Sequence, residues 1–400
     1  MKAFLLRLFI VLGPLGNIFT PAVFPNAFRT YYFILLGFPF FLNSLDKKQL
    51  KLLFLATPFF LYCFLSSILG LSEEPESLVR FFLFLSQFLF VWAAASYLKN
   101  QTEALNLYLK SFFLSLIIGY GFFIGFYLGL FSFATIERFS VLGQFGYGLL
   151  RFSIGSYPNE YGIVASFVTS VLLLMMINDE DRIFSKATTI IFLGLTVMAL
   201  LLTTTRSAYI ACLASFLSIA WIKKKAFLWA SGIILCMIGL LKIFKINIIS
   251  FILLGFNLAQ TSQGSMGSRL LLWQEALEAF LSHGFFGQGF GSFSNAHNVY
   301  FQLIVELGLI GCLLLVALLM LAFFKRRGLF FYPQEKMTSA ELFSKRVRRL
   351  GMMHVLWFAL TNHNLNHHLT WFVILLWLSS WLSKRVEISQ PSRESPVASI

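Results

Sequence analysis

Residues 187–222, ATTIIFLGLTVMALLLTTTRSAYIACLASFLSIAWI, decide how this chain is threaded. At 36 residues this block is too long for one transmembrane helix, which needs about 20 residues to cross a hydrocarbon core of about 30 Å. Two shorter helices with a turn at 203–207 fit the length. The lysines at 223–225 then fall on the cytoplasmic side, as the positive-inside rule requires, whereas a single helix would put them outside. We therefore expect the split, with Arg206 at the outer face of a membrane.

Apolar runs of this kind continue along the whole chain. Of its 400 residues 58% are hydrophobic and 12% are charged, whereas soluble domains carry about a quarter of charged residues. The runs are about twenty residues long, which suits membrane-spanning helices. The sequence therefore predicts an all-α, polytopic integral membrane protein with about 12 transmembrane helices and both ends in the cytoplasm.

The net charge of +14 does not indicate a nucleic-acid partner, because the basic residues form short clusters between apolar runs. Such clusters are typical of cytoplasmic loops that fix topology. The four cysteines lie inside apolar runs without paired spacing, so we interpret them as small buried hydrophobes rather than disulfides or metal ligands.

The charge clusters divide the chain into four parts. Residues 1–246 are expected to hold transmembrane helices one to nine, and 247–298 an outer, periplasmic loop. Residues 299–383 hold the last three helices, and 384–400 form a polar cytoplasmic tail. The outer loop contains a short amphipathic helix that we expect to open at Arg269, with Ser268 as its N-cap.

Two arginines are candidates for chemistry. A guanidinium at membrane depth costs several kcal/mol unless it reaches water or a partner, so Arg206 needs an explanation. Snorkelling to the interface is one explanation. Binding of a phosphate is the other, because a guanidinium matches it with two hydrogen bonds. Arg269 sits beside a predicted helix N-terminus, which also favours anions, although an interfacial helix anchored by Trp273 is compatible with the same pattern.

A glycine run and a histidine follow Arg269. Gly284, Gly287, Gly289 and Gly291 resemble a phosphate loop by letters only, since no strand precedes them, and we expect a tight loop or hinge. His297 ends that loop at an outer helix boundary. Its ordinary pKa near neutrality makes it a candidate general base, with a structural role as the alternative.

A second histidine cluster lies further along, where His363 and His367 have the i, i+4 spacing of a helical metal site. No acidic residue accompanies them. We therefore expect a polar lining of the outer vestibule, and neither a metal nor another cofactor.

Taken together, these features resemble the O-antigen ligase and polymerase family of bacterial surface-polysaccharide enzymes. The resemblance rests on residues from Arg206 to the helix after His297. The matching elements are Thr205-Arg206-Ser207, Ser268-Arg269, Trp273, the glycine pattern at 287–291, His297-Asn298 with its flanking residues at 296–300, and Glu306-Leu307-Gly308.

The resemblance implies a reaction. In that family a glycan on an undecaprenyl diphosphate carrier is transferred, on the periplasmic side of the inner membrane, to an acceptor sugar hydroxyl. By this resemblance Arg206 and Arg269 hold the diphosphate and stabilise it as the leaving group, and His297 takes the proton of the acceptor. Residues assigned to substrate binding on the same basis are Arg206, Ser207, Ser268, Arg269, Gly289 and Asn298.

The implied partners are an undecaprenyl-diphosphate-linked glycan, a lipid A core or growing glycan as acceptor, and membrane lipids. About twelve spans and one dominant outer loop favour a ligase. The modest second outer segment at 132–157 leaves a polymerase as the alternative. A transporter or lipid flippase is the alternative from another class. It predicts an internal repeat of broken helices and charges around a mid-membrane cavity, and the sequence shows neither.

Overall fold

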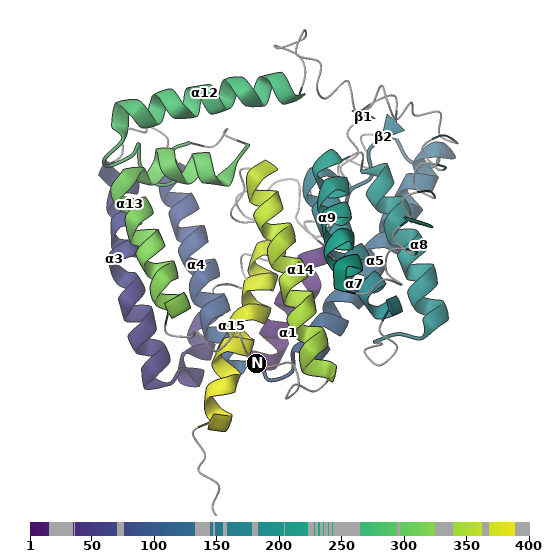
Figure 1. The fold of residues 1–400 in the computed structure, drawn as a ribbon, viewed down its shortest axis with the longest axis horizontal. Helices are drawn as coiled ribbons and strands as arrows, with labels where there is room; N and C mark the ends of the chain where they lie inside the picture. The colour runs from purple at the N-terminus through teal and green to yellow at the C-terminus, as the bar shows by residue number, and fades with distance from the viewer. Residues whose placement is uncertain are drawn as a thin grey trace, which may run out of the picture.

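The computed structural model describes residues 1–15, 35, 37–69, 76–132, 145–146, 149–154, 158–177, 183–203, 205–222, 265–293, 297–324, 339–361 and 368–388, with isolated positions between 228 and 242. These residues form a helical protein, which confirms the predicted all-α class (Figure 1). One antiparallel pair of two-residue strands, β1 (Phe145–Gly146) and β2 (Leu149–Leu150), is added to the helices.

The helices follow one another in chain order. They are α1 (Lys2–Leu15), the 3-10 helix η1 (Phe38–Ser44), α3 (Lys47–Leu69), α4 (Glu76–Tyr97), α5 (Gln101–Tyr127), α7 (Pro158–Ile177), α8 (Lys186–Leu202), α9 (Arg206–Ile222), α12 (Ser265–His283), α13 (Val299–Phe324), α14 (Ser339–Thr361) and α15 (His368–Ile388). Figure 1 shows α12 lying across one side of the bundle, while the N-terminus lies at the opposite side.

Five of the described helices contain segments long and apolar enough to cross a membrane. These segments are Gln49–Leu69, Ser77–Tyr97, Gln101–Tyr127, Pro158–Ile177 and Val299–Met320. Three shorter apolar helices accompany them: Lys186–Leu202, Arg206–Ile219 and His368–Ser380. The chain is therefore a multi-pass membrane protein, and the count of about 12 spans stays a prediction.

The predicted split of the 187–222 block is confirmed. Helix α8 ends at Leu202, and α9 begins at Arg206. The turn between them packs on α7, the most buried of the five candidate spans. A Cβ added to Gly162 of α7 would lie 2.9 Å from the Cβ of Thr205 and 3.0 Å from Oγ1 of Thr203, so only a glycine lets the turn approach this closely.

The structure corrects one expectation and adds a helix break that the sequence analysis did not predict. Helix α12 begins at Ser265, so Ser268 is inside the helix and is not its N-cap. Helix α13 is broken at Gly308 (φ 59°, ψ −168°), a conformation that only glycine adopts readily.

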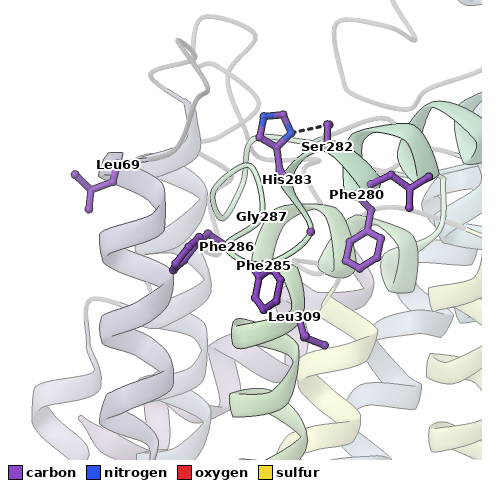
Figure 2. A pocket seen from close by; sticks show the side chains of 10 residues that line it. Leu69, Phe280, Ser282, His283, Phe285, Phe286, Gly287 and Leu309 are labelled. Atoms are coloured by element: carbon purple, nitrogen blue, oxygen red, sulfur yellow. Dashed lines mark hydrogen bonds between the residues drawn. The ribbon is translucent and has the colours of Figure 1, made fainter.

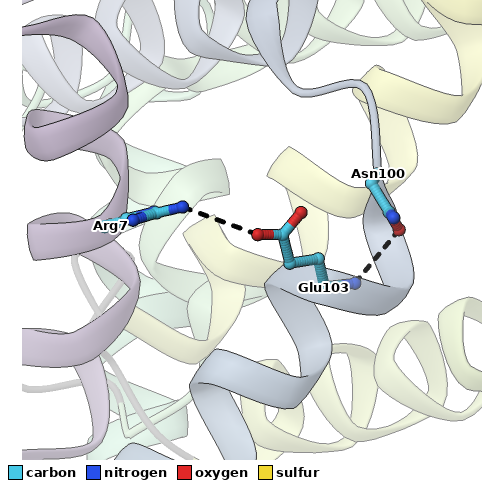
Figure 3. A network of polar contacts seen from close by, with 3 residues as sticks. All are labelled: Arg7, Asn100 and Glu103. Atoms are coloured by element: carbon cyan, nitrogen blue, oxygen red, sulfur yellow. Dashed lines mark hydrogen bonds and ion pairs between the residues drawn. The ribbon is translucent and has the colours of Figure 1, made fainter.

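An exposed polar contact joins α1 to α5 (Figure 3). Arg7 of α1 lies 3.6 Å from Glu103 of α5, and Asn100 caps α5 by accepting a hydrogen bond from the amide of Glu103. Both charged side chains are about two-thirds exposed (68% and 65%). The pair therefore contributes little, and α1 is held on α5 mainly by apolar packing.

Candidate active site

Arg206 is the first residue of α9 and follows a turn that Arg151 holds in place by hydrogen bonds. Nε of Arg151 donates to the carbonyl of Thr203 at 2.9 Å, and its Nη2 donates to Oδ1 of Asn159 at 2.8 Å and to Oγ1 of Thr205 at 3.3 Å. These bonds join the segment before α7 to the α8–α9 turn. The N-terminal end of α9 adds partial positive charge beside Arg206.

Arg151 is a residue whose position sequence reasoning missed. It belongs to a mixed segment of glycine and aromatic residues with no recognisable spacing. The only available signal was an arginine in an outer segment next to apolar helices. Its contact with the turn is made by the tertiary fold.

Arg269 lies on α12, one turn inside the helix. Because α12 begins at Ser265, the amides without helical partners belong to its first turn, about 5 Å before Arg269 along the axis. The expected anion-binding helix end therefore lies slightly further from Arg269 than the sequence implied. The side chain of Ser268 is not among those described, so its assignment to substrate binding stays a prediction.

His297 has a backbone conformation that few residues adopt. Its φ is 46°, in the left-handed region where histidine is found more often than most non-glycine residues. The next residue, Asn298, caps α13: its Oδ1 accepts from the amides of Tyr300 at 2.9 Å and Phe301 at 3.2 Å. The cap occupies Oδ1, so the predicted substrate contact of Asn298 would come from its amide nitrogen.

The fold brings the two arginines and the histidine within electrostatic reach of one another. Burial lowers the pKa of Arg269 below its ordinary value, and the positive charge of Arg206 lowers it further. Burial and then the charge of Arg269 lower the pKa of His297 below 6.5. The arrangement combines two guanidinium groups with an imidazole that is neutral at pH 7, which suits an anionic ligand beside a base.

Aromatic packing holds the segments that carry these residues. The ring centroids of Trp273 on α12 and Phe301 on α13 are 5.6 Å apart, which places α12 beside the first part of α13.

Ser207 lies next to Arg206 in the first turn of α9 and is half-buried. The amide of Gly289 donates to the carbonyl of Glu306 at 3.0 Å, so it already has a partner within the protein. Substrate contacts of Ser207 and Gly289 stay predictions.

The glycine loop, residues 284–291, is a tight loop as expected, with positive φ at Gly287 (72°), Gly289 (108°) and Gly291 (83°). It lies against the break in α13. A Cβ on Gly287 would be 2.5 Å from both the carbonyl oxygen of Glu306 and the amide nitrogen of Gly308. The close backbone approach explains the glycines, and the loop is bonded in place rather than free to act as a hinge.

A cavity of about 690 Å³ lies at the other end of α12 (Figure 2). Phe280, Phe285, Phe286 and Leu309 line it together with His283, whose Nδ1 is 2.9 Å from Oγ of Ser282. At about 1.5 Å per residue, His283 is roughly 21 Å along the helix from Arg269. This largely apolar cavity is therefore separate from the arginine–histidine cluster.

Within the described part of the chain, no group of three or more His, Cys, Asp or Glu side chains is placed to hold a metal ion. The segment with His363 and His367 lies outside the described residues. Three of the four cysteines are described, and all three are free thiols.

Residues 191–316 match the family model described as O-antigen ligase. This segment of the chain is similar to the O-antigen ligase and polymerase family. Members of that family are glycosyl-transferring enzymes, and the similarity supports a general transferase activity for this membrane protein. The matched region includes Arg206, Arg269 and His297, and it excludes α3 and α4. No curated protein matches the chain.

Proposed function

We propose that the protein is an O-antigen ligase. It transfers a glycan from undecaprenyl diphosphate to a sugar hydroxyl of the lipid A core on the periplasmic face of the inner membrane. The observation that supports this proposal is the cluster of Arg206 on α9, Arg269 on α12 and His297 in the segment directly before α13. A diphosphate needs positive charge, and a sugar hydroxyl needs a base.

In the proposed reaction the acceptor hydroxyl oxygen attacks the anomeric carbon of the donor sugar. The bond between that carbon and the diphosphate oxygen breaks, and its electron pair leaves with undecaprenyl diphosphate. Arg206 and Arg269 stabilise the charge on the leaving group. His297 takes the proton of the acceptor hydroxyl and releases it to solvent after transfer.

The lowered pKa of His297 supports its role as a base. An imidazole that were protonated at pH 7 could not accept the proton, whereas burial and the charge of Arg269 favour its neutral form. When the donor diphosphate neutralises Arg269, the pKa of His297 should rise, so that the imidazole becomes a better base in the complex with the donor.

The test is transfer by the purified protein in nanodiscs supplied with a lipid-linked glycan and lipid A core. A ligase produces core-linked glycan and releases undecaprenyl diphosphate. A polymerase instead produces longer lipid-linked glycans when no core is present. Movement of the donor across proteoliposomes without covalent product would support a transporter and contradict the proposal.

Matched variants separate chemistry from folding. Arg206→Ala, Arg269→Ala and His297→Ala should each lose transfer by about 10²-fold or more while the protein remains in the membrane. Arg7→Ala removes an exposed arginine of α1, and His283→Ala removes the histidine at the far end of α12. Both controls should transfer normally, and full activity in His297→Ala would remove the proposed base.

A further inference from the structure

The glycine loop and the broken helix form a joint, by which we mean the contact between residues 284–291 and residues 305–310. Four backbone hydrogen bonds cross it. The amides of Gln288 and Gly289 donate to the carbonyls of Val305 (2.9 Å) and Glu306 (3.0 Å). The amides of Leu309 and Ile310 donate to the carbonyls of Gly284 (2.8 Å) and Phe285 (3.2 Å). The break in α13 exposes backbone groups, and the loop satisfies them.

Tyr62 of α3 fastens both sides of this joint. Its hydroxyl lies 2.7 Å from the carbonyl oxygen of Phe286 in the loop and 2.9 Å from that of Leu307 in α13. The ring packs closely on α13, since a Cβ on Gly311 would be 2.5 Å from Cε1 of Tyr62. One side chain from a separate helix therefore holds loop and broken helix together.

Arg80 of α4 fastens the end of the loop. Its Nη1 donates to the carbonyl of Gly291 at 2.8 Å. The neighbouring Phe290 is buried, and its backbone bonds to α3: its amide donates to Oγ of Ser66 and its carbonyl accepts from Oγ of Ser67, both at 3.2 Å. The loop is thus fixed to the two spanning helices that precede it by more than 200 residues.

The joint is connected to His297 by two routes. Buried Glu306 accepts from Nε2 of Gln302 at 2.8 Å and from the amide of Phe293 at 3.3 Å, four residues before His297. The first part of α13, from the Asn298 cap to Gly308, is a short helix that directly follows His297. Movement of the joint therefore moves His297.

We infer that Tyr62 and Arg80 are positioning residues for His297. They lie outside the region that matches the family, and they hold the joint so that the histidine meets the two arginines. This inference rests on the proposed function, since it assumes that His297 is the base. Small displacements of a catalytic group can cost about 10²-fold in rate, so modest loosening of the joint should be measurable as lost turnover.

The experiment combines hydrogen exchange with kinetics on the full chain in nanodiscs. In Tyr62→Phe, peptides covering 284–293 and 303–310 should exchange faster than in the wild type. The kcat for transfer should fall about 10-fold, with an unchanged KM for the donor. Arg80→Met should have the same effects on exchange and kcat as Tyr62→Phe. Arg80→Lys retains a hydrogen-bond donor, so its kcat should lie between those of Arg80→Met and the wild type. Tyr120→Phe is the matched control, because its hydroxyl donates to the carbonyl of Leu195 at 2.7 Å, away from the joint.

A double-mutant cycle distinguishes positioning from general destabilisation. If Tyr62 acts through His297, then Tyr62→Phe should cause no further loss in the His297→Ala background. An equal loss in both backgrounds, unchanged exchange at the joint, or an effect on KM alone would overturn the inference. Absence of transfer by the wild type would overturn the proposed function instead, while the exchange data would still show whether Tyr62 holds the joint.

Discussion

His297 combines an unusual backbone conformation with an unfavourable electrostatic environment. Its φ of 46° lies in a sparsely populated region, and burial and then the charge of Arg269 lower the pKa of the ring. Such strain and pKa perturbation concentrate at functional sites because the surrounding fold must maintain them. The sequence identified the residue, but not these two properties.

The lowered pKa of His297 predicts the pH dependence of transfer. The active base is the deprotonated form, so kcat/KM should be constant through neutral pH and fall only as pH drops below a value under 6.5. Donor binding neutralises Arg269, so the pKa of His297 should be higher in the donor complex than in the free enzyme. The decrease in kcat at low pH, which reports the complex, should therefore begin at higher pH than the decrease in kcat/KM, which reports the free enzyme. Initial rates at saturating and limiting donor test this order. Coincident decreases would contradict the predicted coupling.

Arg151 should matter through the turn that carries Arg206. Arg151→Met removes the donors to Thr203, Thr205 and Asn159, and should lower stability by about 1–3 kcal/mol together with donor affinity. Thermal unfolding and the KM for the donor measure the two effects. Arg7→Met is the control, because this exposed arginine should change neither quantity.

At the scale of elements, helix boundaries followed from length and charge where those signals were strong. The α8–α9 split was predictable because a long apolar block had to turn before the lysines at 223–225. The break in α13 was not predictable, because Gly308 sits in an apolar run and glycine is common in transmembrane helices. The start of α12 was misplaced because Ser268 is a good N-cap in isolation, but nothing at 265–268 stops the helix.

Gly308→Ala should disrupt the joint. The added Cβ would lie 2.4 Å from the amide nitrogen of Gly287, and alanine does not tolerate φ 59° with ψ −168°. We expect a loss of at least about 1–3 kcal/mol in local stability and a large loss of transfer. Hydrogen exchange of 284–293 measures the first effect. The matched control is Gly121→Ala on α5, where a new Cβ meets nothing within 4 Å.

At the scale of the whole molecule, the predicted topology places α12 outside and the start of α8 inside. In a cysteine-free background, Ser282→Cys should react with a membrane-impermeant maleimide in intact spheroplasts. Lys186→Cys should react only after permeabilisation. Both positions are exposed, so access to the reagent depends on the side of the membrane. Labelling of Lys186→Cys in intact spheroplasts would contradict the proposed threading.

The sequence by itself determined the all-α membrane class, the α8–α9 split and the residues of the candidate site. Apolar run lengths and basic clusters are local signals that a bilayer imposes on any chain. Only the tertiary structure decided that Arg151 holds the turn of Arg206 and that Tyr62 and Arg80 fasten the glycine loop to a broken α13. These contacts join residues far apart in the chain, and backbone hydrogen bonds at a helix break leave no periodic pattern in the sequence.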